Sequence, residues 1–464
     1  MLPFKEVEIA DRNSEYRGVP PIELMENAGR GLAEVIHERF LDKKVLFICG
    51  TGNNGGDAYV AARYLSEKIG TENVTVFLIK GEENIRSEIS RKNFEKLDCE
   101  IIEDIDWERY EDHLLVDALL GTGISGEIRE PYRTVIKEMN SRDDPIISVD
   151  VPSGLGADLQ VKPIITVTFH DVKIGMTEDD CGEIIVKDIG IPEKALEYTG
   201  PGEMLLYPEP SNDSHKGDNG NLLVVGGGPY TGAPALAAEA AYRAGADLVH
   251  LAVPNEIIDI VAGYSESFIV HPLEGKKLRK SHKDAILEIA QRCDAAVIGP
   301  GLGDDENTLK TVKMLIGKLD IPVLIDADGL KAVSKYDIEF DGKAILTPHM
   351  GEFMDLCNKG NFPENAVKYS EENNVTLVVK GKEDLITDGI RKKWNDFGNP
   401  GMTVGGTGDT LSGVIGALLS KGLESYEAGR LGTYMTCKAG DEAFKEKKWS
   451  LLPKDIIDNI SSLW

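Results

Sequence analysis

A short segment near the end of the chain places one acid in a glycine-rich turn. Residues 403–413 read TVGGTGDTLSG, in which glycines and hydroxyl residues surround the single carboxylate of Asp409. Backbone N–H groups in such a turn, where an apolar helix begins, form a concave anion site. They can stabilise a phosphoryl group in transit, and the carboxylate beside them can accept the proton of an attacking hydroxyl. The segment predicts phosphoryl transfer with Asp409 as base; the alternative is an aspartate that only caps the helix.

A second glycine turn lies in the first half of the chain. The stretch CGTGNNGGDAYVAARYL predicts a strand that ends at Cys49 and a helix that begins near Asp57. Glycines between them let backbone N–H groups reach an anion, although many tight turns of this kind bind nothing. Asn53 and Asn54 interrupt the plain dinucleotide-binding spacing, and amide oxygens at a strand end suit a monovalent cation. This turn therefore predicts a ligand site more specifically than a bare glycine loop.

Two further strand ends in this half carry polar residues. Asp117 is followed by the loop of residues 121–127, and the segment SVDVPSG supplies Asp150 and Ser153. The carboxyl ends of parallel strands meet at one edge of a sheet, where such folds bind ligands. Each acid alone is more typical of a cap or a turn. Together they indicate one site.

Both halves alternate continuous apolar runs with helical patterns, which predicts parallel sheets covered on both faces by helices. In residues 23–41 the helical face consists of Leu24, Ala28, Leu32, Val35, Ile36 and Phe40. The expected strands in the first half are KVLFICG, VTVFLIK, HLLVDALLG and PIISVDVP. Those in the second half are LLVVGGG, LVHLAVP, AAVIGPGLG, PVLIDADGL, KAILTPH and VTLVVKG. The fold class is α/β, with a Rossmann-like three-layer domain followed by a second α/β domain.

Periodicity stops around residues 200–220, which are rich in Pro, Gly, Asn, Asp and Ser, as linkers are. We therefore expect domains of residues 1–208 and 209–464. The formal charge of −28 argues against a nucleic-acid or acidic-membrane partner, because either would need a basic face. Six widely spaced cysteines indicate free thiols, and no apolar run approaches the ~20 residues of a membrane span. A cytoplasmic protein is expected.

The first half resembles the epimerase domain of NAD(P)H-hydrate repair enzymes through LMENAG, GTGNNGGD, DALLGTG and SVDVPSG, in this order. The resemblance implies a potassium ion at Asn54, Asp117 and Ser153. It also implies that the dinucleotide hydrate is held by Asn53, Asn54, Gly55, Gly56, Asp57, Gly121, Thr122, Gly123, Ile124, Ser125, Gly126, Glu127, Tyr132 and the catalytic Asp150.

The second half resembles the dehydratase domain of the same repair system, which has a ribokinase-like fold. The motifs are HKGDNGNLLVVGG, YTGAPALAAEAAYRAGADLV, GPGLG, LIDADGL, TPHMGE, VVKG and GGTGDTLSG. The resemblance implies hydrate contacts at Ala233, Gly303, His349 and Asp409, and nucleotide contacts at Lys380, Gly381, Lys382, Glu383, Asp384 and Gly408. The chain departs from the family at Met350 and at residues 382–384, and the second departure bears on the nucleotide contacts implied there. Asp326 and Asp328 could hold magnesium through water, or cap a strand end.

The resemblance implies one purpose for both halves. Hydration at C6 of a reduced nicotinamide ring gives R and S epimers, NADHX or NADPHX; the first domain would interconvert them. The second would dehydrate the S epimer with ADP, giving AMP, with ATP also possible as donor and with Mg²⁺. We expect a homo-oligomer. The alternatives are a ribokinase-like kinase for a vitamin precursor or sugar alcohol, fused to a dinucleotide-binding module, and a non-catalytic binding module.

Overall fold

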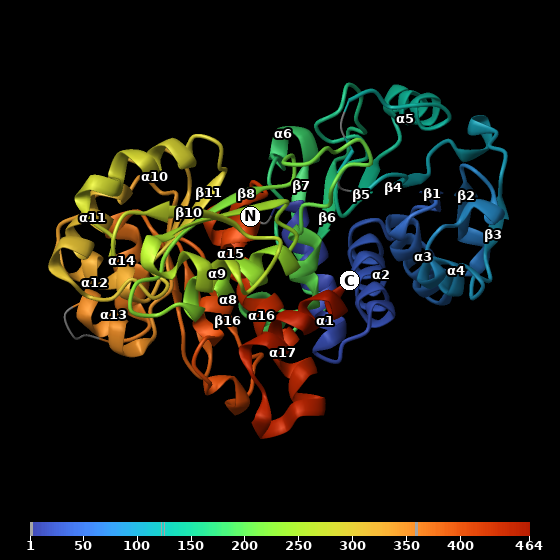
Figure 1. The fold of residues 1–464 in the computed structure, drawn as a ribbon. Coiled ribbons are helices and arrows are strands. Elements are labelled where there is room, and N and C mark those ends of the chain that lie inside the picture. Colours follow the sequence, from blue (N-terminus) through green and yellow to red (C-terminus); the bar gives the residue numbers. More distant parts are fainter. Residues whose placement is uncertain (1–2, 122, 125, 358–360) are drawn as a thin grey trace. The chain divides into compact units, whose positions relative to one another are not determined.

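The computed structural model describes residues 3–121, 123–124, 126–357 and 361–464. It divides into two compact units, Met1–Leu196 and Glu197–Trp464 (Figure 1). This confirms two α/β domains in succession. The division precedes the expected linker, whose first part, Pro201–Leu206, forms a 3₁₀ helix within the second unit. No helix among the described residues is both long and apolar enough to cross a membrane.

The first unit is built on a parallel sheet. In its described part the sheet has seven strands in the order β3-β2-β1-β4-β5-β6-β7, and neighbouring strands run parallel. The strands are β1 (Val45–Cys49), β2 (Val74–Leu78), β3 (Glu100–Ile102), β4 (Leu114–Ala118), β5 (Ile146–Val149), β6 (Ile165–Phe169) and β7 (Glu183–Lys187). The helices are α1 (Phe4–Tyr16), α2 (Pro21–Arg39), α3 (Asn53–Ile69), α4 (Glu88–Phe94), α5 (Tyr132–Ser141), α6 (Glu178–Cys181) and α7 (Glu193–Glu197).

Alternate residues of the central strand β1 enter two different cores. Phe47 packs with the buried faces of α2 and α3, whereas Leu46 packs with α5 on the other side. Helices thus cover both faces of the sheet, as a continuous apolar strand requires. The predicted face of α2 is buried except at Phe40, which is the C-terminal cap. The helix expected near Asp57 begins at Asn53 instead, so the asparagines form its first turn.

The second unit contains a larger, mixed sheet. Its described residues form nine strands in the order β10-β9-β8-β11-β12-β13-β14-β15-β16, parallel as far as β14 and antiparallel beyond it. The strands are β8 (Asn221–Val225), β9 (Leu248–Pro254), β10 (Ile269–Leu273), β11 (Ala295–Ile298), β12 (Val323–Ile325), β13 (Ala344–Leu346), β14 (Thr376–Val379), β15 (Asp384–Thr387) and β16 (Lys392–Asn395).

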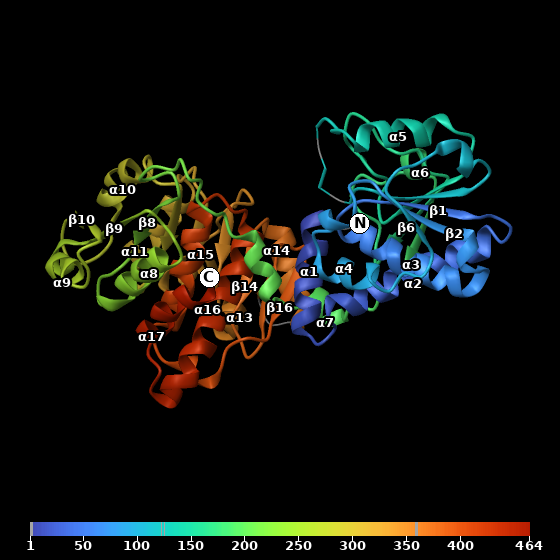
Figure 2. The same ribbon diagram turned by 90° about the vertical axis from the view of Figure 1, so that its right-hand side faces the viewer.

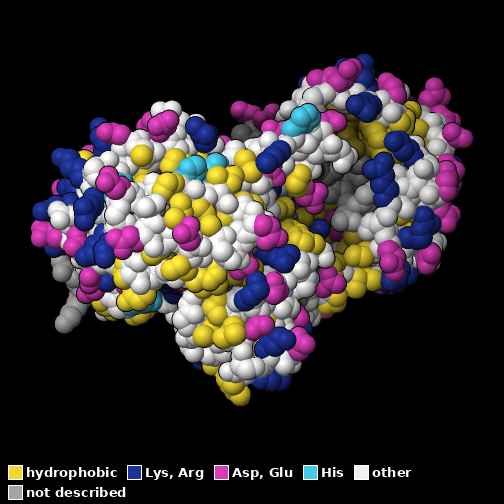
Figure 3. Space-filling view, viewed as in Figure 1, with side chains coloured by type: hydrophobic (Ala, Val, Ile, Leu, Met, Phe, Trp, Pro, Cys, Tyr) yellow, Lys and Arg dark blue, Asp and Glu magenta, His cyan; other side chains and the backbone are white. Residues whose placement is uncertain are grey.

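Two layers of helices cover this second sheet. One layer consists of α8 (Gly232–Arg243), α15 (Thr407–Ser420), α16 (Ser425–Lys447) and α17 (Pro453–Asn459), which Figure 2 labels. Side chains of these helices pack against Leu222 and Val224 of β8. The other layer consists of α10 (Lys283–Ala290), α11 (Glu306–Ile316), α12 (Asp328–Lys335), α13 (Met350–Leu356) and α14 (Glu364–Asn373). Side chains of this layer pack against Leu223 and Val225 of β8. The remaining helix of this unit with a label is the short α9 (Ile258–Ala262). Basic and acidic side chains are interspersed on the surface shown in Figure 3.

Candidate functional site

At the carboxyl edge of the first sheet, Asp117 and Ser153 are in direct contact. Asp117 lies in β4, one residue before the strand ends, and has no exposed surface. It accepts hydrogen bonds from the Ser153 backbone N–H at 2.8 Å and from Ser153 Oγ at 2.5 Å. The Ser148 hydroxyl donates to the same carboxyl at 2.7 Å. Burial raises the pKa of Asp117 above its usual range, while the hydrogen bonds from Ser153 and Ser148 oppose this rise.

Asn54 joins this pair through the backbone of Leu120. Asn54 Nδ2 donates to Leu120 O at 3.3 Å and to Val149 O at 3.0 Å, and the Leu120 N–H donates to Ser153 Oγ at 2.8 Å. The three predicted cation ligands therefore come together with two backbone carbonyls. One carboxylate among amide, hydroxyl and carbonyl oxygens is the chemistry of a monovalent cation site, so these residues fit potassium.

Asp150 follows β5 in a strained backbone conformation. Its φ is 64°, a left-handed value that is uncommon outside glycine and that clusters at functional sites. Its carboxyl forms an ion pair with Lys173, and the side chain is 15% exposed. Lys173 is buried, and its Nζ also donates to Thr168 Oγ1 at 2.7 Å and to Phe169 O at 2.8 Å. The ammonium group is thus fixed beside Asp150 by atoms of β6.

Two more acids share this region. Asp57, in the second turn of α3, is 8% exposed, and burial together with the charges of Asp150 and Asp11 raises its pKa well above the usual value. Asp11, on α1, has a pKa of about 6, raised by burial and then by Asp150. Three carboxyl groups and one lysine therefore influence one another around the predicted catalytic acid.

Gly121, the first residue of the loop 121–127, lies next to the asparagine turn. A Cβ atom at Gly121 would lie 2.9 Å from Asn54 Oδ1. Gly123, Ile124, Gly126 and Glu127 are exposed; Thr122 and Ser125 lie outside the described residues. Tyr132 begins α5, with Lys80 Nζ 4.8 Å from its ring centre. Gly55 and Gly56 are buried in the first turn of α3.

In the second unit, Asp409 lies in the first turn of α15. Gly406 precedes the helix in a left-handed conformation with φ of 101°, and no side chain caps the helix. Among the described residues no hydrogen bond or ion pair to the Asp409 carboxyl occurs, so the capping alternative has no support in the geometry. Burial, with the charges of Asp326 and Asp328, raises the pKa of Asp409 to about 7, although Lys380 opposes this rise.

A buried ion pair stands beside this turn. Lys380 Nζ donates to Asp326 Oδ1 at 2.9 Å, and Ser412 Oγ, on α15, donates to Oδ2 at 2.6 Å. Burial alone would raise the pKa of Asp326, but Lys380 holds it below the usual value. A Cβ atom at Gly408 would lie 3.4 Å from Lys380 Nζ. The glycine thus leaves open the space in front of the lysine.

Asp328 orders the neighbouring glycine turn. It accepts from the Gly303 N–H at 2.8 Å and from Lys331 Nζ at 2.9 Å. A Cβ atom at Gly301 would lie 3.2 Å from that of Ala233, so Ala233 and Gly303 border the same turn. Among the described residues no group of three or more His, Cys, Asp or Glu side chains could hold a metal. Since Asp326 and Asp328 already accept hydrogen bonds, they fit magnesium held through water rather than directly.

His349 and Lys380 are neighbours on adjacent strand ends. Their backbones form a parallel bridge, and the Lys380 N–H donates to Pro348 O at 2.8 Å. His349 caps α13 by accepting from the Glu352 N–H at 3.1 Å, yet its side chain is 61% exposed. The predicted histidine therefore has a structural role and an accessible ring at once.

Residues 381–384 divide into exposed and buried parts. Gly381, Lys382 and Glu383 are exposed, whereas Asp384, the first residue of β15, is buried. The Asp384 carboxyl accepts from the Gly381 N–H and from Asn395 Nδ2, both at 3.0 Å. Its contacts hold the β14–β15 turn in shape, so any nucleotide contact here falls to the residues before it.

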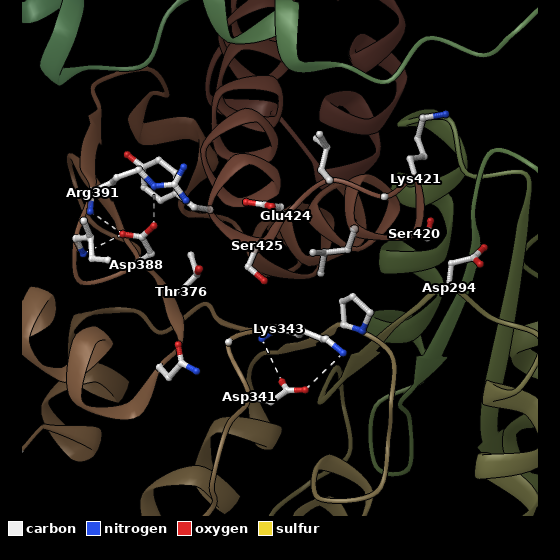
Figure 4. Close-up of a pocket in the computed structure, with 18 of the residues that line it drawn as sticks. Asp294, Asp341, Lys343, Thr376, Asp388, Arg391, Ser420, Lys421, Glu424 and Ser425 are labelled. Carbon is white, nitrogen blue, oxygen red and sulfur yellow. Dashed lines mark hydrogen bonds and ion pairs between the residues drawn. The ribbon is translucent and has the colours of Figure 1, made fainter. Parts of the chain in front are cut away.

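A separate pocket of about 960 Å³ opens at the other edge of the second sheet (Figure 4). Its lining includes Asp294 and Lys343, which directly precede β11 and β13, and Glu424 before α16. Asp388 pairs with Arg391 at 2.7 Å. The pocket contains none of the predicted site residues, because those lie at the carboxyl ends of the strands.

The structure adds three residues to which the sequence assigned no role: Lys173 and Asp11, which lie outside every motif, and Ser412, which lies within one. Nothing in the sequence distinguishes Lys173 and Asp11 from charged residues on the surface, and neither has a recognisable spacing to another site residue. Ser412 lies within the glycine-rich segment and one helical turn after Gly408, to whose carbonyl it donates at 3.0 Å. Its position on the same helical face as Gly408 could have identified it.

Comparisons with known proteins agree with this geometry. Residues 222–462 match the family model described as NAD(P)H-hydrate dehydratase, and residues 21–175 match the model described as YjeF-related protein N-terminus. The bifunctional NAD(P)H-hydrate repair enzyme of Archaeoglobus fulgidus is 38% identical over 98% of this chain and 97% of its own. That of Methanocaldococcus jannaschii is 37% identical over 99% and 92%.

Solved structures match the second unit. A ribokinase-like superfamily protein from Enterococcus faecalis aligns with a TM-score of 0.53 at 23% identity, over 57% of this chain and 94% of that one. The ADP/ATP-dependent NAD(P)H-hydrate dehydratase from Bacillus subtilis, co-crystallised with ATP and Mg²⁺, aligns with a TM-score of 0.50 at 27% identity, over 55% and 93%. The second unit is ribokinase-like, as expected, and the chain belongs to the family of bifunctional NAD(P)H-hydrate repair enzymes.

Proposed function

We propose that this protein repairs hydrated NADH and NADPH. The first unit interconverts the R and S epimers, and the second dehydrates the S epimer while ADP is converted to AMP and phosphate. The observation that carries this proposal is the arrangement at Asp409: an aspartate with a pKa of about 7 beside a glycine turn and the Lys380–Asp326 pair. Family membership supplies the substrate class.

In the second unit, Asp409 takes the proton of the C6 hydroxyl as its oxygen attacks the terminal phosphorus of the nucleotide. The P–O bond to AMP breaks, and N–H groups of the turn, with Lys380, stabilise the charge on the transferred group. The ring nitrogen's lone pair then expels phosphate from C6. Loss of the proton from the adjacent ring carbon restores the dihydropyridine. A group with a pKa near 7 is well matched to such a transfer.

In the first unit, the substrate lies between the asparagine turn and the loop of residues 121–127. Asp150, held by Lys173, exchanges a proton during epimerisation. Asn54, Asp117 and Ser153 hold potassium, which would supply a fixed positive charge beside the anionic dinucleotide. Magnesium would accompany the nucleotide phosphates through water at Asp326 and Asp328. We propose ADP as donor with ATP as an alternative, and the B. subtilis relative named as ADP/ATP-dependent supports either.

The remaining proposals concern the whole protein. We propose a cytoplasmic homo-oligomer, in keeping with the six cysteines, which are free in the described structure. The domain boundary is proposed near residue 208, between the last residue of the 3₁₀ helix Pro201–Leu206 and the start of the matched family segment at 222.

The test uses the full chain with R and S NADHX, Mg²⁺, K⁺ and either ADP or ATP. Recovery of NADH absorbance from both epimers, with AMP as product, is expected. Asp150→Asn should slow R-epimer consumption by ~10²-fold or more and leave S-epimer dehydration intact. Equal loss of both activities would contradict the division of labour. A stable phosphoester with no NADH recovered would instead identify a ribokinase-like kinase.

A further inference from the structure

The acids around Asp150 differ in the partners available to them. Asp150 has Lys173, Thr168 Oγ1 at 3.3 Å and the Phe169 N–H at 3.3 Å. Asp57 is more than nine-tenths buried, and within the part of the chain that the structure describes its carboxyl has no hydrogen bond or ion pair. An isolated buried carboxylate is costly, so such a group takes up a proton.

Asp11 adds to this effect from a different element. It lies on α1, before the segment that the family model matches, and its negative charge acts on Asp57. The charged groups that act on Asp57 are Asp150 after β5, Asp11 on α1 and Lys173 after β6, and Glu8 acts in turn on Asp11. Three carboxylates facing one ammonium group cannot all remain ionised in a buried site.

We propose that Asp57 is the general acid of the epimerase site and that Asp11 is a positioning residue that keeps Asp57 protonated. This inference rests on the proposed epimerase function. Asp57 lies in the turn assigned to the substrate, whereas Asp150 and Lys173 form the charged pair beside it. The site therefore holds a neutral acid and a carboxylate, the two states that acid–base catalysis requires.

The proposed reaction conserves every atom. Asp57 donates its proton to the C6 hydroxyl, the C6–O bond breaks, and water leaves as the ring nitrogen's lone pair forms a C6=N iminium bond. Water then adds to the other face of C6, with the electron pair of the C=N bond returning to nitrogen. Asp150 accepts the proton of the adding water, and proton exchange through that water returns Asp57 to its acid form. The configuration at C6 is the only change.

The experiment measures conversion of R-NADHX into S-NADHX by the full chain without nucleotide, so that dehydration does not occur, after subtraction of the spontaneous rate. The active form of a general acid is protonated, so the wild-type rate should fall as pH rises through the pKa of Asp57. Asp57→Asn should lower kcat by ~10²-fold or more with KM changed much less. Normal activity of this variant would overturn the proposal.

Asp11→Asn provides the second readout. Removing its charge lowers the pKa of Asp57, so the decline in rate should begin at lower pH, with a several-fold loss on the basic side and little loss on the acidic side. Asp11→Glu should restore the wild-type profile. Glu15→Gln, an exposed acid on the same helix, is the matched control and should change nothing.

Two outcomes separate the explanations. An equal loss at every pH in Asp11→Asn would show a structural role and overturn its assignment. Absence of epimerisation in the wild-type protein would contradict the proposed function itself rather than the role of these residues. Thermal unfolding and S-epimer dehydration with ADP, measured on each variant, verify that the chain is folded.

Discussion

Replacing Asp409 by Asn removes the carboxylate but keeps the size of the side chain. Burial and the nearby Asp326 raise the pKa of Asp409 to about 7. A base acts when it is deprotonated, so dehydration should increase with pH through this value. The ionised fraction is about one-tenth at pH 6 and about nine-tenths at pH 8, which predicts a rise in rate of roughly tenfold.

The magnitude of the loss follows from the contacts around Asp409. No other group in the described part of the turn is free to accept the proton, because Asp326 is bound to Lys380 and Ser412. Asp409→Asn should therefore reduce the dehydration rate by ~10²- to 10⁴-fold, the usual contribution of general acid–base catalysis. Nucleotide binding should persist, because the backbone N–H groups and Lys380 are unchanged.

The dehydration rate is measured as the increase in NADH absorbance with S-NADHX as substrate. ADP binding is measured separately by calorimetric titration. Asp337→Asn, an exposed aspartate after α12, is the matched control and should behave as wild type. A variant at Asp409 that keeps more than about a third of normal turnover would refute the assignment of the base. A wild-type rate that is flat between pH 6 and 8 would refute the link between its pKa and catalysis.

Two further predictions concern binding and stability. Gly408→Val should weaken ADP binding by tenfold or more in calorimetry, because its Cβ, 3.4 Å from Lys380 Nζ, fills the space in front of the ammonium group; unchanged affinity would place the phosphate elsewhere. Glu203→Gln should destabilise the second unit by ~3–5 kcal/mol in urea unfolding, because the buried Lys393, 2.8 Å away, loses its partner. Replacing the exposed Lys454 by Gln should cost about 1 kcal/mol or less, and equal effects would contradict the burial argument.

The parts predictable from the sequence are those in which local pattern and tertiary position coincide. The sequence predicts that Asp117 and Ser153 share one site, because both lie where the carboxyl ends of parallel strands meet at one edge of a sheet. The structure places them 2.5 Å apart, joined by hydrogen bonds. The Gly406–Asp409 turn can likewise be predicted from the sequence. The structure adds that Gly406 has the left-handed conformation and that Gly408 already belongs to the helix.

The parts not predictable depend on packing between distant segments. Lys173 reaches Asp150 from the residues after β6, a strand whose alternating threonines gave no strong apolar run. Asp11 belongs to a helix in which acids are numerous, so its half-buried position and its effect on Asp57 could not be predicted from the sequence. The antiparallel strands β15 and β16 were missed because they contain few apolar residues, yet they bury Asp384.

The two units, with different strand orders, contain the same electrostatic arrangement. In each, a buried lysine neutralises one aspartate at a strand end: Lys173 with Asp150, and Lys380 with Asp326. In each, a second aspartate in the first turns of a helix lacks such a partner, and burial raises its pKa: Asp57 and Asp409. The negative charge of the paired aspartate raises the pKa of the unpaired one: Asp150 acts on Asp57, and Asp326 acts on Asp409. The unpaired aspartate is the group suited to start proton transfer near neutral pH: Asp409 accepts the proton of the C6 hydroxyl, and Asp57 donates its proton to the leaving hydroxyl. In the proposed epimerase reaction the second transfer is made by Asp150, which accepts the proton of the adding water while Lys173 remains beside it.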